Sequence, residues 1–386
     1  MEKLHNDFLL IIKNTVLNKK IDFTGMDLES LAKLFKFHSL IYLYVKALWD
    51  NKQTVKSELL FEKQKEFMRC ATQMAELDEI KNELNKEKIP YLPLKGSIIR
   101  TYYSDPAMRS MADLDILVHK DDVKKVKDIL LKCGYETYIS NEHASHDNFM
   151  KKPFMEVEVH RKLVLENAHS YNYLKDIWSY AKKTGDSFEY RLDDNSFYIY
   201  YIMHSIKHFS HGGTGVRIFL DLYYMQKRDN TLDFNLISNT LFEYGYDKYE
   251  LLLRDITSKI FNYDSEITLS SEEELILEYI ITSGTYGNIY HNVLTQVEDN
   301  SKRSKNKYVL NRLFPDYKTM KARNPVLEKA PFLLPFFWVT RLFKGLFHFK
   351  EHNSERKVAK KNISQDAIDK KRKIEEITNI KCFYEK

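Results

Sequence analysis

The stretch that decides the fold is LPLKGSIIRTYYSDPAMRSMADLDILV, residues 92–118. It sets two aspartates, Asp113 and Asp115, one residue apart at the start of an otherwise apolar run. Residues i and i+2 of a strand share a face, so both carboxylates would point the same way while the apolar residues between and after them point into the core. Adjacent like charges repel and raise each other's pKa, a cost that a divalent cation between them would offset. This run therefore predicts a strand that carries a metal site.

The residues before this strand predict a site for phosphate. Lys95, Gly96 and Ser97 follow an apolar run and precede IIRTYY, which is the order strand, tight turn and helix start. The free backbone N–H groups of such a turn, with the Ser97 hydroxyl, form an anion site, and Gly96 lets the backbone come close. Lys95 and Arg109 lie close to this turn in the sequence, where a basic residue is either part of the site or an ordinary surface residue.

A third acidic position lies in FMEVEVH, residues 154–160. Strand alternation puts Glu156, Glu158 and His160 on one face, so the alternation alone does not show which glutamate joins the aspartates. Glu158 has a valine on each side, as in a central strand, and is therefore the predicted third metal ligand. Such hard oxygen ligands favour Mg²⁺, or Mn²⁺ in its place. His160 would orient Glu158, contact a substrate or have a purely structural role.

Short apolar runs suited to strands are set between regions with helical periodicity. The runs lie at 89–94, 113–118, 135–139 and 154–160, with helical segments at about 97–103 and 120–132. Residues 5–50, 57–87 and about 170–300 have helical patterns. The sequence thus predicts a small α/β or α+β module flanked by helical regions.

Length and cysteine content bound the class of protein. A chain of 386 residues is long enough for two or three domains. Its three cysteines are scattered and lack a CxxC spacing, which argues against a disulfide framework and against a zinc knuckle. The apolar patch near the amino terminus is broken by Lys13 and is too short for a signal peptide or a membrane span. We therefore expect a cytoplasmic protein.

Positive charge is concentrated near the carboxy terminus. Residues 301–386 contain 22 Lys and Arg against 9 Asp and Glu, although the whole chain carries only +5. Such a segment could contact an anionic membrane, nucleic acid or an acidic partner, or it could be solvated surface. Within it, residues 331–350 (PFLLPFFWVTRLFKGLFHFK) form either an interfacial membrane helix or a packing helix with snorkelling lysines.

Together these motifs carry a family resemblance. LKGSIIRTYYSDPAMRSMADLDILV, then GYE, EVEVH and HSIKHFSHGGTGVRIFLDLYYM, resembles the uncharacterised bacterial nucleotidyltransferase family, a branch of the DNA polymerase β-like nucleotidyltransferase superfamily. The superfamily pattern falls on Gly96 and Ser97, then on Asp113 and Asp115, and finally on Glu158. The lysine before the glycine and the 15-residue spacer depart from the general pattern, but both resemble this family.

The resemblance implies an α+β fold, a nucleotidyltransferase-type α/β palm with a small mixed sheet flanked by N- and C-terminal helical regions. The expected divisions are an N-terminal helical region at 1–86, the palm domain at 87–168, a helical domain at 169–300, and a basic, aromatic and helical C-terminal segment at 301–386.

The implied activity is metal-dependent transfer of an NMP from an NTP, such as ATP, to a hydroxyl of an unidentified acceptor, which would be a small molecule, a protein or an RNA. Asp113, Asp115 and Glu158 would be the catalytic groups and would hold two metal ions. The turn at Gly96 and Ser97 would hold the β- and γ-phosphates, and Lys95 or Arg109 could neutralise charge on the leaving pyrophosphate. Two alternatives stay open. One is a noncatalytic nucleotide-binding or regulatory protein of the same fold, and the other is a peripheral membrane or assembly factor that acts through residues 331–350.

Two side-chain pairs beyond the palm have weaker signals. His204 and His208 stand at i and i+4 and could chelate a metal on a helix face, but no HExxH motif surrounds them. Arg217 and Asp221 would form either a helix ion pair or a wall of the acceptor pocket. For both pairs a structural role is the favoured interpretation.

Overall fold

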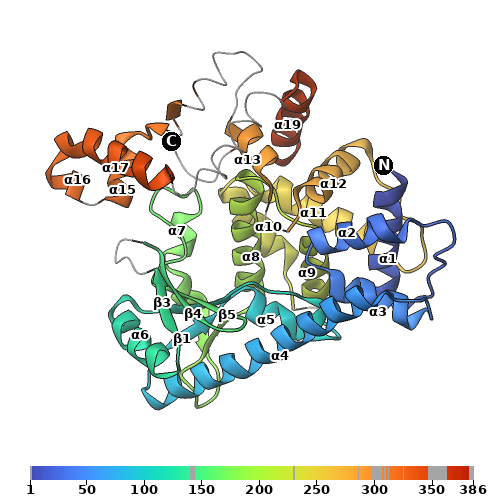
Figure 1. Ribbon diagram of the computed structural model, residues 1–386, viewed down its shortest axis with the longest axis horizontal. Coiled ribbons are helices and arrows are strands. Elements are labelled where there is room, and N and C mark those ends of the chain that lie inside the picture. The colour runs from blue at the N-terminus through green and yellow to red at the C-terminus, as the bar shows by residue number, and fades with distance from the viewer. Residues whose placement is uncertain are drawn as a thin grey trace.

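The computed structural model shows a mixed α+β fold in which helices surround one small sheet (Figure 1). It describes residues 2–139, 144–228, 231–285, 287–296, 307, 310–311, 313–324, 326–346 and 363–381. The predicted fold class, a small mixed sheet flanked by helical regions on both sides in the sequence, is confirmed.

The sheet has five strands in the order β1-β2-β5-β4-β3. Their bounds are β1 Tyr91–Pro93, β2 Leu114–Val118, β3 Glu136–Ile139, β4 His146–Lys151 and β5 Met155–His160. β2 and β5 are parallel, and the other neighbouring strands are antiparallel. Four strands coincide with the predicted runs, whereas β4 was not predicted. The parallel pair β2 and β5 places the two acidic motifs side by side at the centre of the sheet.

One face of the sheet is covered by the long helix α4 (Ser57–Lys86) and by α6 (Val123–Lys132), which lie below and beside it in Figure 1. Every second residue of the strands supplies an apolar side chain to this face, as Val157 and Val159 of β5 do. Three α4 side chains, Leu77, Ile80 and Leu84, join this cluster. The opposite face is therefore left to the polar residues of the same strands.

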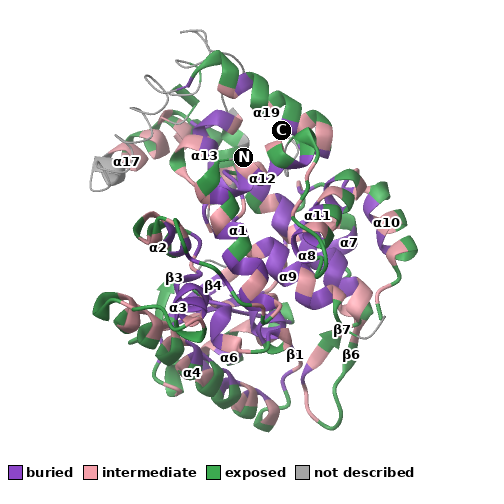
Figure 2. Ribbon diagram, turned by 90° about the vertical axis from the view of Figure 1, so that its right-hand side faces the viewer, coloured by how far each residue is buried: buried purple, intermediate pink, exposed green. Residues whose placement is uncertain are grey.

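The remaining helices form one larger core with the turn after β1. They are α1 (Lys3–Val16), α2 (Leu28–Phe37), α3 (Ile41–Asp50), α7 (Tyr171–Leu174), α8 (Asp194–Ser210), α9 (Arg217–Gln226), α10 (Phe234–Glu243), α11 (Asp247–Ile260) and α12 (Ser271–Ser283). Figure 2 shows α8 and α9 as largely buried helices at the centre of this core. Helix α13 (Ile289–Gln296) packs in a smaller, separate cluster with Ile363 and Ile368. A short hairpin, β6 (Ala181–Lys183) and β7 (Tyr190–Leu192), interrupts a region predicted to be mostly helical.

The described part of the C-terminal segment is helical. It comprises α15 (Tyr317–Arg323), α16 (Val326–Lys329), α17 (Leu334–Leu346) and α19 (Gln365–Thr378), and residues 347–350 of the predicted amphipathic segment lie outside the described residues. In α17, Trp338 donates a hydrogen bond to the Pro315 carbonyl at 2.9 Å, while Phe336 is 60% exposed. Within the described residues, no helix combines the length and apolar character needed to cross a membrane.

Candidate active site

The face of the sheet away from α4 and α6 presents polar side chains in two rows. Asp115 on β2, Glu158 on β5 and Asn148 on β4 are register partners across three strands. His160 on β5 and His146 on β4 are partners in the next row. Because side chains alternate along a strand, these residues all leave the sheet on the same side.

The structure brings the three predicted carboxylates together. Asp113 immediately precedes β2, and oxygen atoms of Asp113, Asp115 and Glu158 lie within 4.8 Å of one another. Asp115 is buried, whereas Asp113 and Glu158 are partly exposed. Glu156 lies just before the part of β5 that pairs with β2, so it has no register partner among the aspartates. The convergence of three hard oxygen ligands is suited to a divalent cation.

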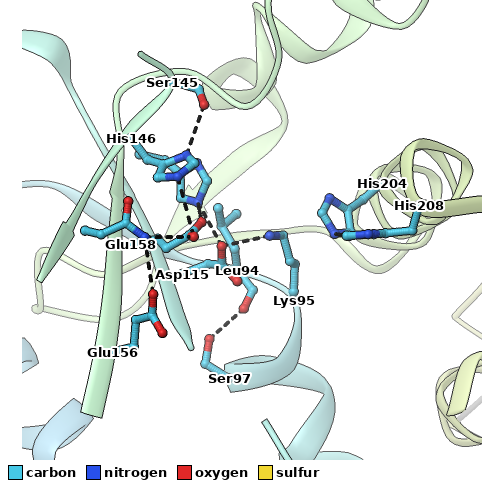
Figure 3. Close-up of polar contacts among 12 residues, drawn as sticks. Leu94, Lys95, Ser97, Asp115, Ser145, His146, Glu156, Glu158, His204 and His208 are labelled. Atoms are coloured by element: carbon cyan, nitrogen blue, oxygen red, sulfur yellow. Dashed lines mark hydrogen bonds and ion pairs between the residues drawn. The ribbon is translucent and has the colours of Figure 1, made fainter. Parts of the chain in front are cut away.

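Lys95 provides positive charge inside this cluster (Figure 3). Its Nζ donates a hydrogen bond to Asp115 Oδ1 at 2.7 Å, and only 17% of the lysine side chain is exposed. The backbone of Lys95 has φ 45° and ψ −118°, a region that non-glycine residues rarely adopt. Backbone strain of this kind is concentrated at functional sites, where the surrounding structure holds it in place.

His160 joins two of the carboxylates. Its Nε2 lies 2.8 Å from Asp115 Oδ1 and 3.2 Å from Glu158 Oε2. Burial alone would lower the pKa of His160, but its contacts with both carboxylates raise the pKa above the ordinary value. The predicted role in orienting Glu158 agrees with this geometry, and the same contact also fixes Asp115.

The two aspartates have opposite electrostatic environments. Burial alone would raise the pKa of Asp115, but Lys95 and His160 hold it well below its usual range. For Asp113, burial and then the charge of Asp115 raise the pKa to about 6. Glu158 resembles Asp115: burial would raise its pKa, but the hydrogen bond with His160 and the nearby His146 together lower it. Asp113 is thus the carboxylate that lacks a full counter-charge and gains most from a bound cation.

The predicted phosphate turn begins helix α5 (Gly96–Ile99) directly beside the carboxylates. The Ser97 hydroxyl donates to the Leu94 carbonyl at 2.6 Å, so in this structure it braces the turn. A Cβ atom on Gly96 would lie 2.4 Å from Arg109 Nη1 and 2.7 Å from Met111 Sδ. Only glycine fits at this position without displacing one of these side chains.

Arg109 has a partner other than a phosphate. It makes a two-pronged ion pair with Asp221 of α9, with Nε to Oδ1 and Nη2 to Oδ2 both at 2.8 Å, and both residues are buried. Tyr103 and Tyr201 donate to the same carboxylate at 2.6 and 2.8 Å. The predicted nucleotide-binding role of Arg109 is therefore not favoured by this geometry, which instead makes Arg109 a support for the Gly96 turn. Arg217 donates to the Ser110 carbonyl at 2.6 Å.

Sequence reasoning missed the contribution of β4. Asn148 Nδ2 donates to Glu158 Oε1 at 3.2 Å, and His146 Nε2 lies 3.5 Å from the same oxygen. Ser145 Oγ is 3.0 Å from the other ring nitrogen of His146. The sequence HASHDNF carries the only available signal, two histidines and an asparagine in a segment without strand alternation.

Helix α8 stands across from the carboxylates, with Lys95 between them in Figure 3. The Nε2 atoms of His204 and His208 are 2.9 Å apart, and neither residue belongs to a group of three candidate metal ligands in the described part of the chain. Lys207 lies between them in sequence, and burial, followed by the charge of Lys95, lowers its pKa. The helix therefore contributes basic groups, not further carboxylates, to this side of the site.

Comparison with known proteins gives one finding. A family model described as "Uncharacterised nucleotidyltransferase" matches residues 24–262, which include the three carboxylates, the Gly96 turn and α8. No curated protein and no solved structure matches the chain.

Proposed function

The chain belongs to the uncharacterised nucleotidyltransferase family, and from that premise we propose that it transfers an NMP from an NTP to an acceptor hydroxyl with the help of divalent cations. The observation that carries the proposal is the convergence of Asp115 on β2, Glu158 on the adjacent parallel strand β5, and Asp113 just before β2, whose oxygens lie within 4.8 Å of one another. Membership in the family supports the class of reaction, and the carboxylates support its dependence on metal.

The residues present fit a hard divalent cation. All three acidic groups offer oxygen ligands, and burial together with the charge of Asp115 raises the pKa of Asp113. Asp113 and Asp115, together with Glu158, would hold Mg²⁺ or Mn²⁺. When bound, the cation would supply positive charge to the phosphate oxygens on which negative charge develops during transfer.

The side chains around the carboxylates position the reacting groups. His160 and Asn148 each donate to a different oxygen of Glu158, which fixes that carboxylate for contact with an acceptor hydroxyl. The turn at Gly96 and Ser97 would bind the β- and γ-phosphates, with its backbone N–H groups donating hydrogen bonds to the phosphate oxygens. Lys207 of α8 would add positive charge on the side of the triphosphate or of an anionic acceptor.

A labelling experiment tests this function. The protein is incubated with each α-³²P-labelled NTP, Mg²⁺ or Mn²⁺, and cell extract separated into small molecules, RNA and protein. We expect label in one of these fractions with at least one NTP, and no label with the Asp113→Asn variant. The melting temperature should also rise more with NTP and Mg²⁺ together than with either alone, because both bind the native state. No label and no such synergy with any NTP would favour the noncatalytic alternative.

The surface of the C-terminal helices favours one further candidate, attachment to a membrane. Phe332 is 79% exposed and Phe336 of α17 is 60% exposed. Removing residues 331–386 would also remove α19, whose Ile374 lies in the main core, so substitution is the cleaner test. Phe332→Asp with Phe336→Asp should abolish sedimentation with anionic vesicles if this surface binds them. Equal sedimentation of both proteins, or none with the wild type, would contradict attachment.

A further inference from the structure

We propose that Lys95 is a built-in positive charge at the carboxylate site and that the nucleotide-free protein binds one divalent cation, in place of the two that the resemblance implies. The inference rests on the proposed function in one respect, because it takes a divalent cation as the ligand of the carboxylates. In this inference the Lys95 ammonium group is the ion-pair partner of Asp115, whereas the sequence analysis expected it to contact the pyrophosphate.

The contacts at Asp115 leave limited room for cations. Lys95 Nζ and His160 Nε2 both lie within hydrogen-bonding distance of the same oxygen, Oδ1, at 2.7 and 2.8 Å. The other oxygen, Oδ2, has no hydrogen bond or ion pair with the described residues, so it is the oxygen available to a metal ion. A cation at Oδ1 would have to displace two donors, one of them a charged ammonium group.

Glu158 is held in a similar way. Its Oε1 accepts from Asn148 at 3.2 Å, and its Oε2 lies 3.2 Å from His160 Nε2. A second cation bridging Glu158 and Asp115 would need the space that His160 Nε2 fills between those two carboxylates. The oxygens that remain are those of Asp113 and Oδ2 of Asp115, which suit a single cation between the aspartates.

The backbone keeps Lys95 in place. Its φ of 45° directs the chain sharply from β1 into α5, and the amides of Ile98 and Ile99 both donate to the Lys95 carbonyl at 3.1 and 3.0 Å. The residue is thus anchored at both ends, by this turn and by Asp115. Three carboxylates contribute three negative charges, which Lys95 and one divalent cation balance. A second divalent cation would leave excess positive charge until a nucleotide arrives.

Mn²⁺ binding tests the inference without any assay of transfer. Bound Mn²⁺ is counted by equilibrium dialysis and by loss of the free-ion paramagnetic resonance signal, without nucleotide at pH 8. We expect one Mn²⁺ per wild-type chain and two per Lys95→Met chain, with the first ion bound about tenfold more tightly in the variant because the competing charge is gone. Lys95→Arg keeps the charge and should bind one Mn²⁺. Lys207→Met removes a nearby charge that does not contact Asp115 and should also bind one.

The outcomes separate this inference from the proposed function. Two Mn²⁺ ions on the wild-type chain would overturn the inference and leave the proposed function intact. One ion on both the wild type and Lys95→Met, with equal affinity, would also overturn it. No Mn²⁺ on any of these proteins would overturn both. If Lys95→Met does not fold, a Mn²⁺-soaked crystal of the wild type decides, since Lys95 Nζ must stay within hydrogen-bonding distance of Asp115 Oδ1 with one ion bound.

Discussion

Asp115 on β2 and Glu158 on β5 face each other as register partners of two parallel strands, and His160 hydrogen-bonds to both. The two residues are separated by more than forty positions in the sequence, yet their carboxylates are held together by one shared donor, His160. Asp113, two residues before Asp115, lies at the edge of this pair, and among the described residues no comparable pair of donors contacts its carboxylate. The three carboxylates should therefore respond differently to substitution.

Asp113→Asn should stabilise the metal-free protein above pH 6. The folded-state pKa of Asp113 is raised to about 6, above its unfolded value near 4, so the folded protein holds the proton more tightly. The contribution of Asp113 to the free energy of unfolding is fully present below about pH 4 and is lost as the pH rises through 6. Asparagine does not ionise, so the variant avoids this loss. Its free energy of unfolding should exceed that of the wild type by near zero at pH 4 and by about 1–3 kcal/mol at pH 7.5. Urea unfolding across this range measures it, and a constant or negative difference would contradict the prediction.

Asp115→Asn should do the opposite. From the sequence alone, replacing either aspartate should relieve the repulsion between the two carboxylates. The structure, however, pairs Asp115 with Lys95 and His160. The folded-state pKa of Asp115 is lowered, so its contribution is present above the unfolded pKa and is lost as the pH falls. Removing the carboxylate leaves a buried ammonium group without its partner, which costs about 3 kcal/mol at pH 7.5. A variant as stable as the wild type in EDTA would show that the pair is not formed in solution.

The sequence predicted the strands of the site better than its contacts. The runs that became β2 and β5 alternate apolar and polar residues, and this local pattern fixes which side each acidic group takes. β4 was missed because His146, Asp147 and Asn148 open it with three polar residues, all of them wholly or partly buried in the structure. Their burial depends on neighbouring strands, which no local pattern contains.

Ion pairs between distant segments were also beyond prediction. Arg109 and Asp221 are 112 positions apart, and the sequence offered Asp221 a nearer partner in Arg217 at helical spacing. Burial decided between them, because Arg109 lies in the core where a carboxylate is needed to balance it. The contact of Lys95 with Asp115 is of the same kind, since it depends on how the turn after β1 is folded against β2.

Asp221→Asn should strongly destabilise the protein. The carboxylate balances a buried guanidinium group and accepts hydrogen bonds from Tyr103 and Tyr201, so its loss leaves Arg109 charged and unbalanced. Breaking such a buried pair costs about 3–5 kcal/mol. Tyr201→Phe removes a single donor and should cost only about 1 kcal/mol. Urea unfolding of both variants checks the ranking, and equal effects would contradict it.

Gly96→Ala should destabilise the turn at the site. The added Cβ would lie 2.4 Å from Arg109 Nη1, and Arg109 cannot easily move because Asp221 holds it. Overpacking of this kind costs about 1–3 kcal/mol and should also weaken nucleotide binding. Gly185→Ala is the control for nucleotide binding: no atom lies within 4 Å of its added Cβ, so its φ of 57° should cost about 1 kcal/mol of backbone strain and leave nucleotide affinity unchanged. Wild-type stability together with wild-type nucleotide affinity in Gly96→Ala would show that the turn adapts.

The last prediction separates the two glutamates of β5. Glu158 pairs in register with Asp115, and its carboxylate is held by His160 and Asn148, whereas Glu156 precedes the stretch that pairs with β2. Glu158→Gln keeps the size of the side chain but removes the charge, so transfer should fall at least about 100-fold while nucleotide still binds at the aspartates. Glu156→Gln makes the same chemical change two residues away and should keep most of the activity. Transfer rate and nucleotide affinity are measured for both variants against the wild type. An inactive Glu156→Gln beside an active Glu158→Gln would overturn the assignment of the third carboxylate.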